Sequence, residues 1–148
     1  MIDPKDVPSV DDDEMLARYI LAGEKTKSLR KLVRPDETIK PQLFMPYPHR
    51  DLSVNRHRDC SEDEIWSFGK AVAAYRDRTF HGRSDISVAD CALDSLEVLA
   101  KPIPPPPDVP ANPNHADIVG FAEKKEDQLS LAAKLAERAS ERKPMPTA

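Results

Sequence analysis

Aromatic residues, cysteines and long apolar runs are all scarce in this chain of 148 residues. Aromatic residues make up 5%, and the only two cysteines do not form the disulfide framework of a small secreted protein. No stretch approaches the roughly 20 apolar residues that a membrane span needs. The first residues, Met1–Asp6, lack the apolar region of a signal peptide. We therefore expect a soluble cytoplasmic protein without a membrane partner.

The balance of charge argues against a general nucleic-acid binder. Charged residues make up 32%, the net charge is −4 and the isoelectric point lies near 5.6. Nucleic-acid-binding domains are usually basic instead. A local basic site remains compatible with this composition.

Proline is abundant, with 15 residues in the chain. Many of these lie in the segment 102–113, which therefore can be neither a helix nor a central strand. We expect a stiff strap in polyproline II conformation over the domain surface. The alternative is a docking segment for an aromatic groove on a partner.

The distribution of apolar residues predicts one α+β domain over residues 11–142, between flexible tails at 1–10 and 143–148. We expect a small, short-stranded, mostly antiparallel sheet packed with two to three helices. The expected elements are a first helix between Asp11 and Gly23, a short irregular helix in 25–34, strands at 42–45, 52–55, 85–88 and 96–100, a bend at 79–83, turns at 89–93 and 112–117, and helices at 62–75 and 125–142.

The stretch Leu52–Trp66 carries the clearest local signals. A short strand runs through a polar loop into a helix that begins at a capping box, with Ser61 as the N-cap and Glu64 three residues later. Cys60 directly precedes this cap. It is interpreted as a small apolar side chain packing against Ile65, or alternatively as a thiol activated near a helix N-terminus.

Eight polar side chains lie at strand ends, caps or turns, where different elements can bring them to one pocket. They are Ser53, Arg56, His57, Cys60, Glu62, His81, Arg83 and His115. One interpretation is a zinc site, because His57-x-x-Cys60 has ligand spacing and His81, Cys91 and His115 are further ligand candidates. Zinc is the one cofactor that the residues suggest.

A second interpretation is an enzyme, and the residues leave open whether the chain is one. Cys60 would act as nucleophile, His57 or His115 as the base, and Glu62 or Asp117 as the acid that orients the base.

A third interpretation is a pocket for a small anion. Arg56 and Arg83 each adjoin a short strand and, with Ser53, His57 and His81, could hold a phosphate or carboxylate by forked hydrogen bonds. Other arginines of the region are interpreted as solvated surface charges paired with nearby acids, namely Arg58, Arg76 and Arg78.

Short patterns in the chain resemble those of small bacterial proteins of unassigned function. They are Leu52-Ser53-Val54-x-Arg56-His57, Ser61-Glu62 with Trp66, His81-Gly82-Arg83-x-Asp85 and Asn112-Pro113-Asn114-His115-Ala116. The chain is also similar to the Cys–Glu–His–His accessory proteins that accompany bacterial ubiquitin-like conjugation genes, with Cys60, Glu62, His81 and His115 as the matching set. This resemblance implies a bacterial protein, gene neighbours in defence or modification systems, and a common site for those four residues.

Together these observations favour an accessory protein that binds a protein partner or a small anionic ligand through a His/Arg/Cys pocket. An enzyme that uses Cys60 or His115, or a zinc-binding protein, is the alternative.

Overall fold

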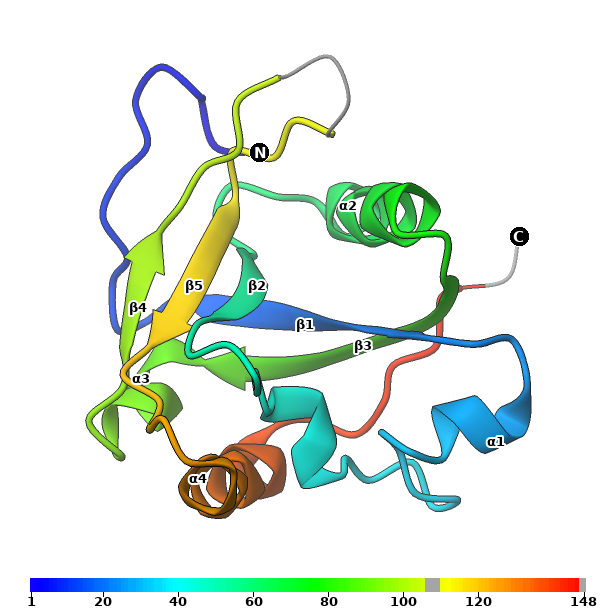
Figure 1. Ribbon diagram of the computed structural model, residues 1–148. Helices are drawn as coiled ribbons and strands as arrows, with labels where there is room; N and C mark the ends of the chain where they lie inside the picture. Colours follow the sequence, from blue (N-terminus) through cyan, green and yellow to red (C-terminus); the bar gives the residue numbers. More distant parts are fainter. Residues whose placement is uncertain (106–109, 147–148) are drawn as a thin grey trace.

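A five-stranded sheet, in which all neighbouring strands are antiparallel, forms the centre of the molecule (Figure 1). The computed structural model describes residues 1–105 and 110–146. The strand order is β3-β1-β2-β5-β4. The strands are β1 (Met15–Ala22), β2 (Leu52–Arg56), β3 (Thr79–Ser87), β4 (Glu97–Ala100) and β5 (His115–Val119). The helices are α1 (Thr26–Leu29), the 3-10 helix η1 (Pro41–Phe44), α2 (Glu62–Tyr75), α3 (Val88–Ala92) and α4 (Lys125–Arg138). The predicted α+β fold with an antiparallel sheet is therefore confirmed.

The two faces of the sheet are covered unequally. On one face, α4 and η1 enclose the larger core, and its fully buried side chains include Leu16, Phe44, Ile118 and Leu135. On the other face, the single helix α2 packs on β1 and β3 (Figure 1). Beneath α2, the rings of Trp66 and Phe80 lie 5.8 Å apart. No helix of the described residues lies over the part of this face formed by β2 and β5.

The predicted first helix is instead strand β1, which corrects the expectation. Its apolar residues looked helical because they do not alternate along the sequence. A strand that is covered on both faces of its sheet needs no alternation of apolar and polar residues. In β1, both Leu16 and its neighbour Ala17 are fully buried.

Four smaller differences between the predicted and the observed elements concern short segments. Residues 42–45 are not a strand, because Pro41 at the first helical position favours the turn of η1. The predicted bend at 79–83 belongs to β3, where Gly82 continues the strand with a φ of +116°. The turn at 89–93 is the short helix α3, and β5 begins at His115, within the predicted turn at 112–117.

The N-terminal residues lie against the domain. Ile2, in the predicted N-terminal tail, is 1% exposed, and its N–H donates to the Asn114 side chain at 2.9 Å. Residues 106–109 of the predicted proline strap lie outside the described residues. The strap is closed at its base by two backbone hydrogen bonds of 2.9 Å between Ile103 and Asn112.

Helix α4 ends at Arg138, before the predicted end at Arg142, because the following residues run along the outer edge of β3. Arg83 and Lys143 exchange backbone hydrogen bonds of 3.0 and 2.8 Å, and the Ser140 N–H donates to the Asp85 carbonyl at 2.8 Å. Residues 140–143 are called the edge segment below. They require a glycine at position 82, since a Cβ there would lie 2.2 Å from the Lys143 carbonyl oxygen.

Replacing Gly82 by alanine should therefore lower the free energy of unfolding by about 2–4 kcal/mol, because the added Cβ displaces the edge segment. Gly120→Ala is the matched control. Gly120 also has a positive φ, of +105°, but the nearest atom to its Cβ would be 3.4 Å away. Urea unfolding of both variants checks this, and equal losses would contradict the role given to the edge segment.

Candidate functional site

The eight predicted site residues occupy several separate places and do not share one pocket. His57, Glu62 and Arg83 gather at the start of α2. Ser53 and His115 line a groove on the sheet face beside α2. The remaining three lie in separate surroundings, namely Arg56, Cys60 and His81.

At the start of α2, the buried Asp85 carboxylate holds a charged network together. His57 Nε2 lies 3.0 Å from its Oδ1, the Lys143 ammonium donates to Oδ2 at 2.8 Å, and Arg83 Nε donates to Oδ1 at 3.1 Å. The other two nitrogens of Arg83 donate to the exposed Glu62 carboxylate, both at 3.0 Å. Each nitrogen group of this network thus lies within hydrogen-bond distance of a carboxylate. The network connects α2, β3 and the edge segment.

Asp85 shows how strong this network is. Burial alone would raise its pKa, but hydrogen bonds from His57 and Lys143 lower the pKa to about 2. Arg83 is 1% exposed, and its guanidinium lies 4.5 Å from the Trp66 ring centre. Arg83 is therefore occupied by internal partners, which does not favour its predicted role in binding an external anion.

Arg56 is also occupied by the protein itself. It is 1% exposed, and its Nε and Nη2 donate to the two oxygens of the buried Glu14 carboxylate at 2.7 and 2.8 Å. Its Nη1 donates to the Pro8 carbonyl at 2.7 Å. A buried pair of this kind fixes the segment before β1 to the end of β2 and leaves no face for a ligand.

The sulfur and imidazole candidates do not gather into a ligand set. His81 bonds to the Gly23 carbonyl at 2.7 Å, and His115 bonds to the Lys101 carbonyl at 2.8 Å. Both cysteines are free, and Cys91 is fully buried with a pKa raised to about 12 by burial. Over the residues that the structure describes, no group of three or more His, Cys, Asp or Glu is placed to hold a metal ion.

The thiol of Cys60 is not activated. Its pKa is raised, mainly by burial, and although the N-terminal ammonium acts in the opposite direction, Glu64 also raises it. Burial, together with the nearby carboxylates of Glu64 and Asp59, thus outweighs the N-terminal ammonium in setting the pKa of this thiol.

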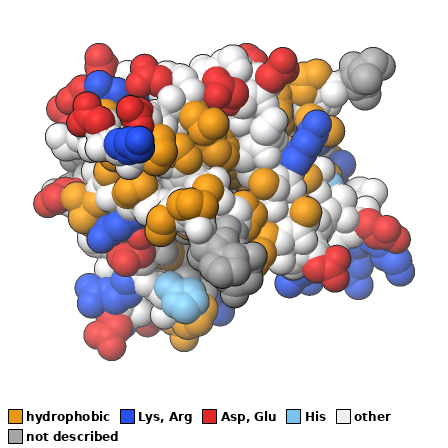
Figure 2. All heavy atoms as spheres, turned by 90° about the horizontal axis from the view of Figure 1, so that it is seen from above, with side chains coloured by type: hydrophobic (Ala, Val, Ile, Leu, Met, Phe, Trp, Pro, Cys, Tyr) orange, Lys and Arg blue, Asp and Glu red, His pale blue; other side chains and the backbone are white. Residues whose placement is uncertain are grey.

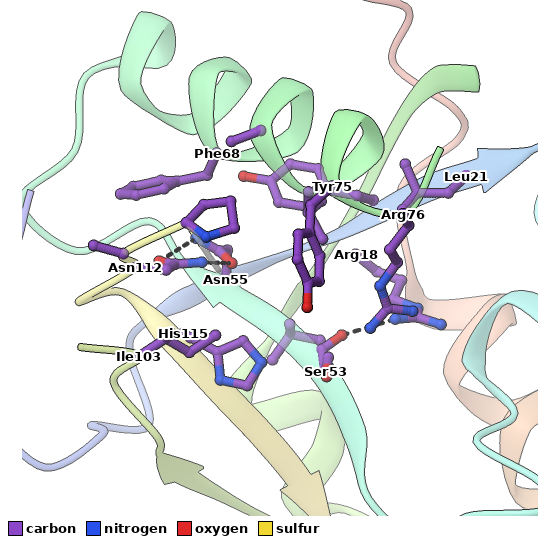
Figure 3. A pocket seen from close by; sticks show the side chains of 16 residues that line it. Arg18, Leu21, Ser53, Asn55, Phe68, Tyr75, Arg76, Ile103, Asn112 and His115 are labelled. Carbon is purple, nitrogen blue, oxygen red and sulfur yellow. Dashed lines mark hydrogen bonds between the residues drawn. The ribbon is translucent and has the colours of Figure 1, made fainter. Parts of the chain in front are cut away.

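The groove beside α2 has a volume of about 150 Å³. The side chains of α2 form its upper wall, the strands its floor, and residues at both ends of the proline strap its far wall (Figure 3). Its described lining includes Arg18, Leu21, Ser53, Asn55, Phe68, Val72, Tyr75, Arg76, Ile103, Pro110, Asn112 and His115. Seen from the α2 side, apolar side chains gather in the middle of the molecule, and acidic and basic side chains surround them (Figure 2). The groove is thus mostly apolar, with polar groups at its ends.

Two arginines form one end of the groove (Figure 3). Arg18 of β1 reaches the point where β1 and β2 separate, and its guanidinium donates to the carbonyls of Leu43 and Ser53, both at 2.9 Å. Burial and, to a smaller extent, the charge of Arg76 together lower the pKa of Arg18 to about 10, so the guanidinium stays charged at neutral pH. Neither Arg18 nor Arg76 forms a salt bridge with an Asp or Glu in the described ranges.

The other end of the groove is polar and has no arginine in its described lining. The side-chain amides of Asn55 and Asn112 donate to each other at 3.1 and 2.9 Å, which fixes the strap against β2. His115 follows on β5, and its Nε2 lies 3.8 Å from Asp117 Oδ1. Burial raises the pKa of the Asp117 carboxyl; His115 opposes this effect, and Asp51 adds to it.

Sequence reasoning missed Arg18 and Arg76 for identifiable reasons. In the predicted helix, Arg18 would have been one more solvated residue, whereas in a central strand it is a charge within an otherwise apolar run. Arg76 was interpreted as a surface charge paired with an acid, and such pairing cannot be excluded from sequence alone. A charged residue inside the apolar run Met15–Ala22 was the available signal.

Comparison with known proteins adds no relative: no family model, no curated protein and no solved structure matches the chain. In the described part of the chain, none of the helices has the length and apolar character needed to cross a membrane.

The Asp85 network makes the fold sensitive to acid. The pKa of Asp85 in the folded protein lies below its ordinary value of 3.8, so its stabilisation is complete above that value and is lost as the pH falls toward 2. We expect this carboxyl to account for about 2 kcal/mol of the stability lost over that range. Urea unfolding at a series of pH values should show a shallower loss in Asp85→Asn than in the unchanged protein; parallel curves would contradict the assignment.

The raised pKa of the Cys60 thiol predicts slow chemistry at neutral pH. A disulfide reagent should modify Cys60 of the native protein more slowly than the same cysteine in the urea-unfolded chain, because less thiolate is present. Cys91→Ser removes the second thiol from the assay. A native Cys60 that reacts faster than its unfolded counterpart would restore the nucleophile interpretation.

Proposed function

We propose that this chain is a binding protein for a small organic anion, which it holds in the groove between α2 and the strands β2 and β5. The carboxylate or phosphate of the ligand would lie between Arg18 and Arg76. The apolar body would lie along the side chains of α2, against Phe68 and Val72. The observation that carries this proposal is the partly buried Arg18 guanidinium, which has carbonyl partners and a second cation beside it but no described carboxylate.

The positive charge of Arg18 has no opposite charge paired with it in the described residues. Partial burial of a cation costs free energy, and a neighbouring cation adds to this cost. Two backbone carbonyls satisfy Arg18 Nε and Nη1, while its Nη2 has no hydrogen-bond partner within the described ranges. A bound anion would supply both the missing charge and the missing acceptor, and arginine offers a fork that suits a carboxylate or a phosphate.

The other arginines of the predicted anion pocket offer less. Arg56 and Arg83 already hold carboxylates within the protein, so an external anion would have to displace Glu14 or Glu62. We therefore place the anion-binding site in the groove and not at Arg56 and Arg83. The raised pKa of the Cys60 thiol gives no support to the nucleophilic alternative.

The proposal includes the setting that the sequence predicts, an accessory protein of the bacterial cytoplasm. Two free cysteines are compatible with a reducing compartment. In this proposal a protein partner would act on or receive the bound ligand.

The test uses benzoate and phenyl phosphate as probes and benzyl alcohol as the uncharged comparison. Titrations followed by amide chemical shifts should show saturable binding of both anions, with shifts around Ser53 and Val72, and far weaker binding of the alcohol. Arg76→Gln should weaken anion binding by about tenfold or more, since a charge-assisted hydrogen bond is lost. Added salt should weaken it as well.

Arg78→Gln is the matched control, because Arg78 is an exposed arginine two residues further on that does not line the groove. It should bind the probes as the unchanged protein does. Equal weakening by both variants would mean a diffuse charge effect, and a lack of saturable binding would remove the proposal.

A further inference from the structure

His115 lines the groove on its β5 side, across β2 from Arg18, and Asp117 follows on the same face of β5 just outside the lining. His115 Nδ1 lies 2.8 Å from the Lys101 carbonyl, which can only accept, so Nδ1 carries the hydrogen. In the neutral ring, Nε2 then presents a lone pair. Asp117 Oδ1, 3.8 Å away, is also an acceptor when its carboxyl is ionised.

When the His115 ring is neutral, neither of these two atoms carries a hydrogen, and at 3.8 Å they form no hydrogen bond with each other. No residue in the described ranges donates a hydrogen bond to His115 Nε2 or to the Asp117 carboxylate. Asp117 lies opposite Ser53 in the β2–β5 register, and cross-strand partners point to the same face. Since Ser53 and His115 line the groove, this acceptor pair lies at its rim.

The body of the groove fits one ring. Its volume is about 150 Å³, and an engineered cavity of about that size in another protein takes up benzene. The Tyr75 ring hangs from α2 between the arginine end and His115 (Figure 3). Together with Phe68 it offers aromatic surface for an offset or edge-to-face contact.

From these three features we infer that the ligand is a single-ring organic acid with an O–H or N–H donor on the side of the ring away from the acid group. The inference rests on the proposed function and narrows it. The acid group meets Arg18 and Arg76, the ring lies against Phe68 and Tyr75, and the donor meets His115 Nε2 and the Asp117 carboxylate. A sugar phosphate would place hydroxyl groups against the apolar wall.

Four probes separate the parts of this inference, namely benzoate, 4-hydroxybenzoate, 4-methoxybenzoate and hexanoate. Benzoate supplies acid and ring, the hydroxyl adds a donor, and the methoxy group fills similar space without a donor. Titration calorimetry should find 4-hydroxybenzoate about tenfold tighter than benzoate, the effect of one hydrogen bond to a charged or well-fixed acceptor. The methoxy compound should gain nothing, and hexanoate should bind more weakly than benzoate.

Two variants test where the donor is recognised. His115→Phe keeps a ring but removes the acceptor, and Asp117→Asn removes the charge of the second acceptor. Each should reduce the advantage of 4-hydroxybenzoate over benzoate, measured as the ratio of the two dissociation constants. His49→Phe, at an exposed histidine outside the groove, is the matched control and should preserve that advantage.

The possible failures are distinguishable. If benzoate binds in an Arg76-dependent manner but the hydroxyl adds nothing, or the methoxy group gains as much, this inference is wrong and the proposed function stands. If hexanoate binds as tightly as benzoate, the ring requirement is wrong. If none of the acids binds, the proposed function itself fails.

Discussion

A central strand with apolar side chains on both faces must be covered from both sides, and β1 imposes this constraint on the whole molecule. The residues around Leu16 require a thick layer on one face, which α4 and η1 provide. The second face has only α2 to cover it, and one helix is narrower than five strands. Helix α2 packs on β1 and β3, so the face of β2 and β5 remains open beside it. The groove is thus a direct result of how many helices the chain supplies.

The same geometry explains how the charges are distributed. Where α2 meets the sheet edge at Asp85, cations and carboxylates satisfy one another and hold the layers together. Where α2 leaves the sheet, β1 and β2 separate, and Arg18 fills the opening with only carbonyls as partners. The first arrangement stabilises the fold, and the second leaves a charge unbalanced at the end of a cavity.

How much of this the sequence could predict depends on whether the signal was local. The capping box of Ser61 and Glu64 depends on only four consecutive residues, and it was predicted correctly together with the bounds of α2. The nature of β1 is not local, because whether a run of apolar residues is a helix or a doubly buried strand depends on the neighbours it meets. The error at β1 hid Arg18, and with it the cationic end of the groove. Sequence analysis placed Ser53, Arg56 and His115 in one pocket. In the structure Ser53 and His115 line the groove, whereas Arg56 pairs with Glu14. Predicting this separation would require knowing which face of β2 each side chain occupies.

The edge segment has a consequence for how molecules of this protein can meet. It lies along the outer edge of β3 and takes up hydrogen bonds that a foreign strand would need. Within the described residues, β4 at the other edge pairs only with β5. A sheet with one open edge and one closed edge can pair edge to edge with a second copy through the open edge. It cannot grow further, because the pair then presents closed edges at both ends. Strand addition would therefore end at a twofold dimer and would not propagate into a fibre.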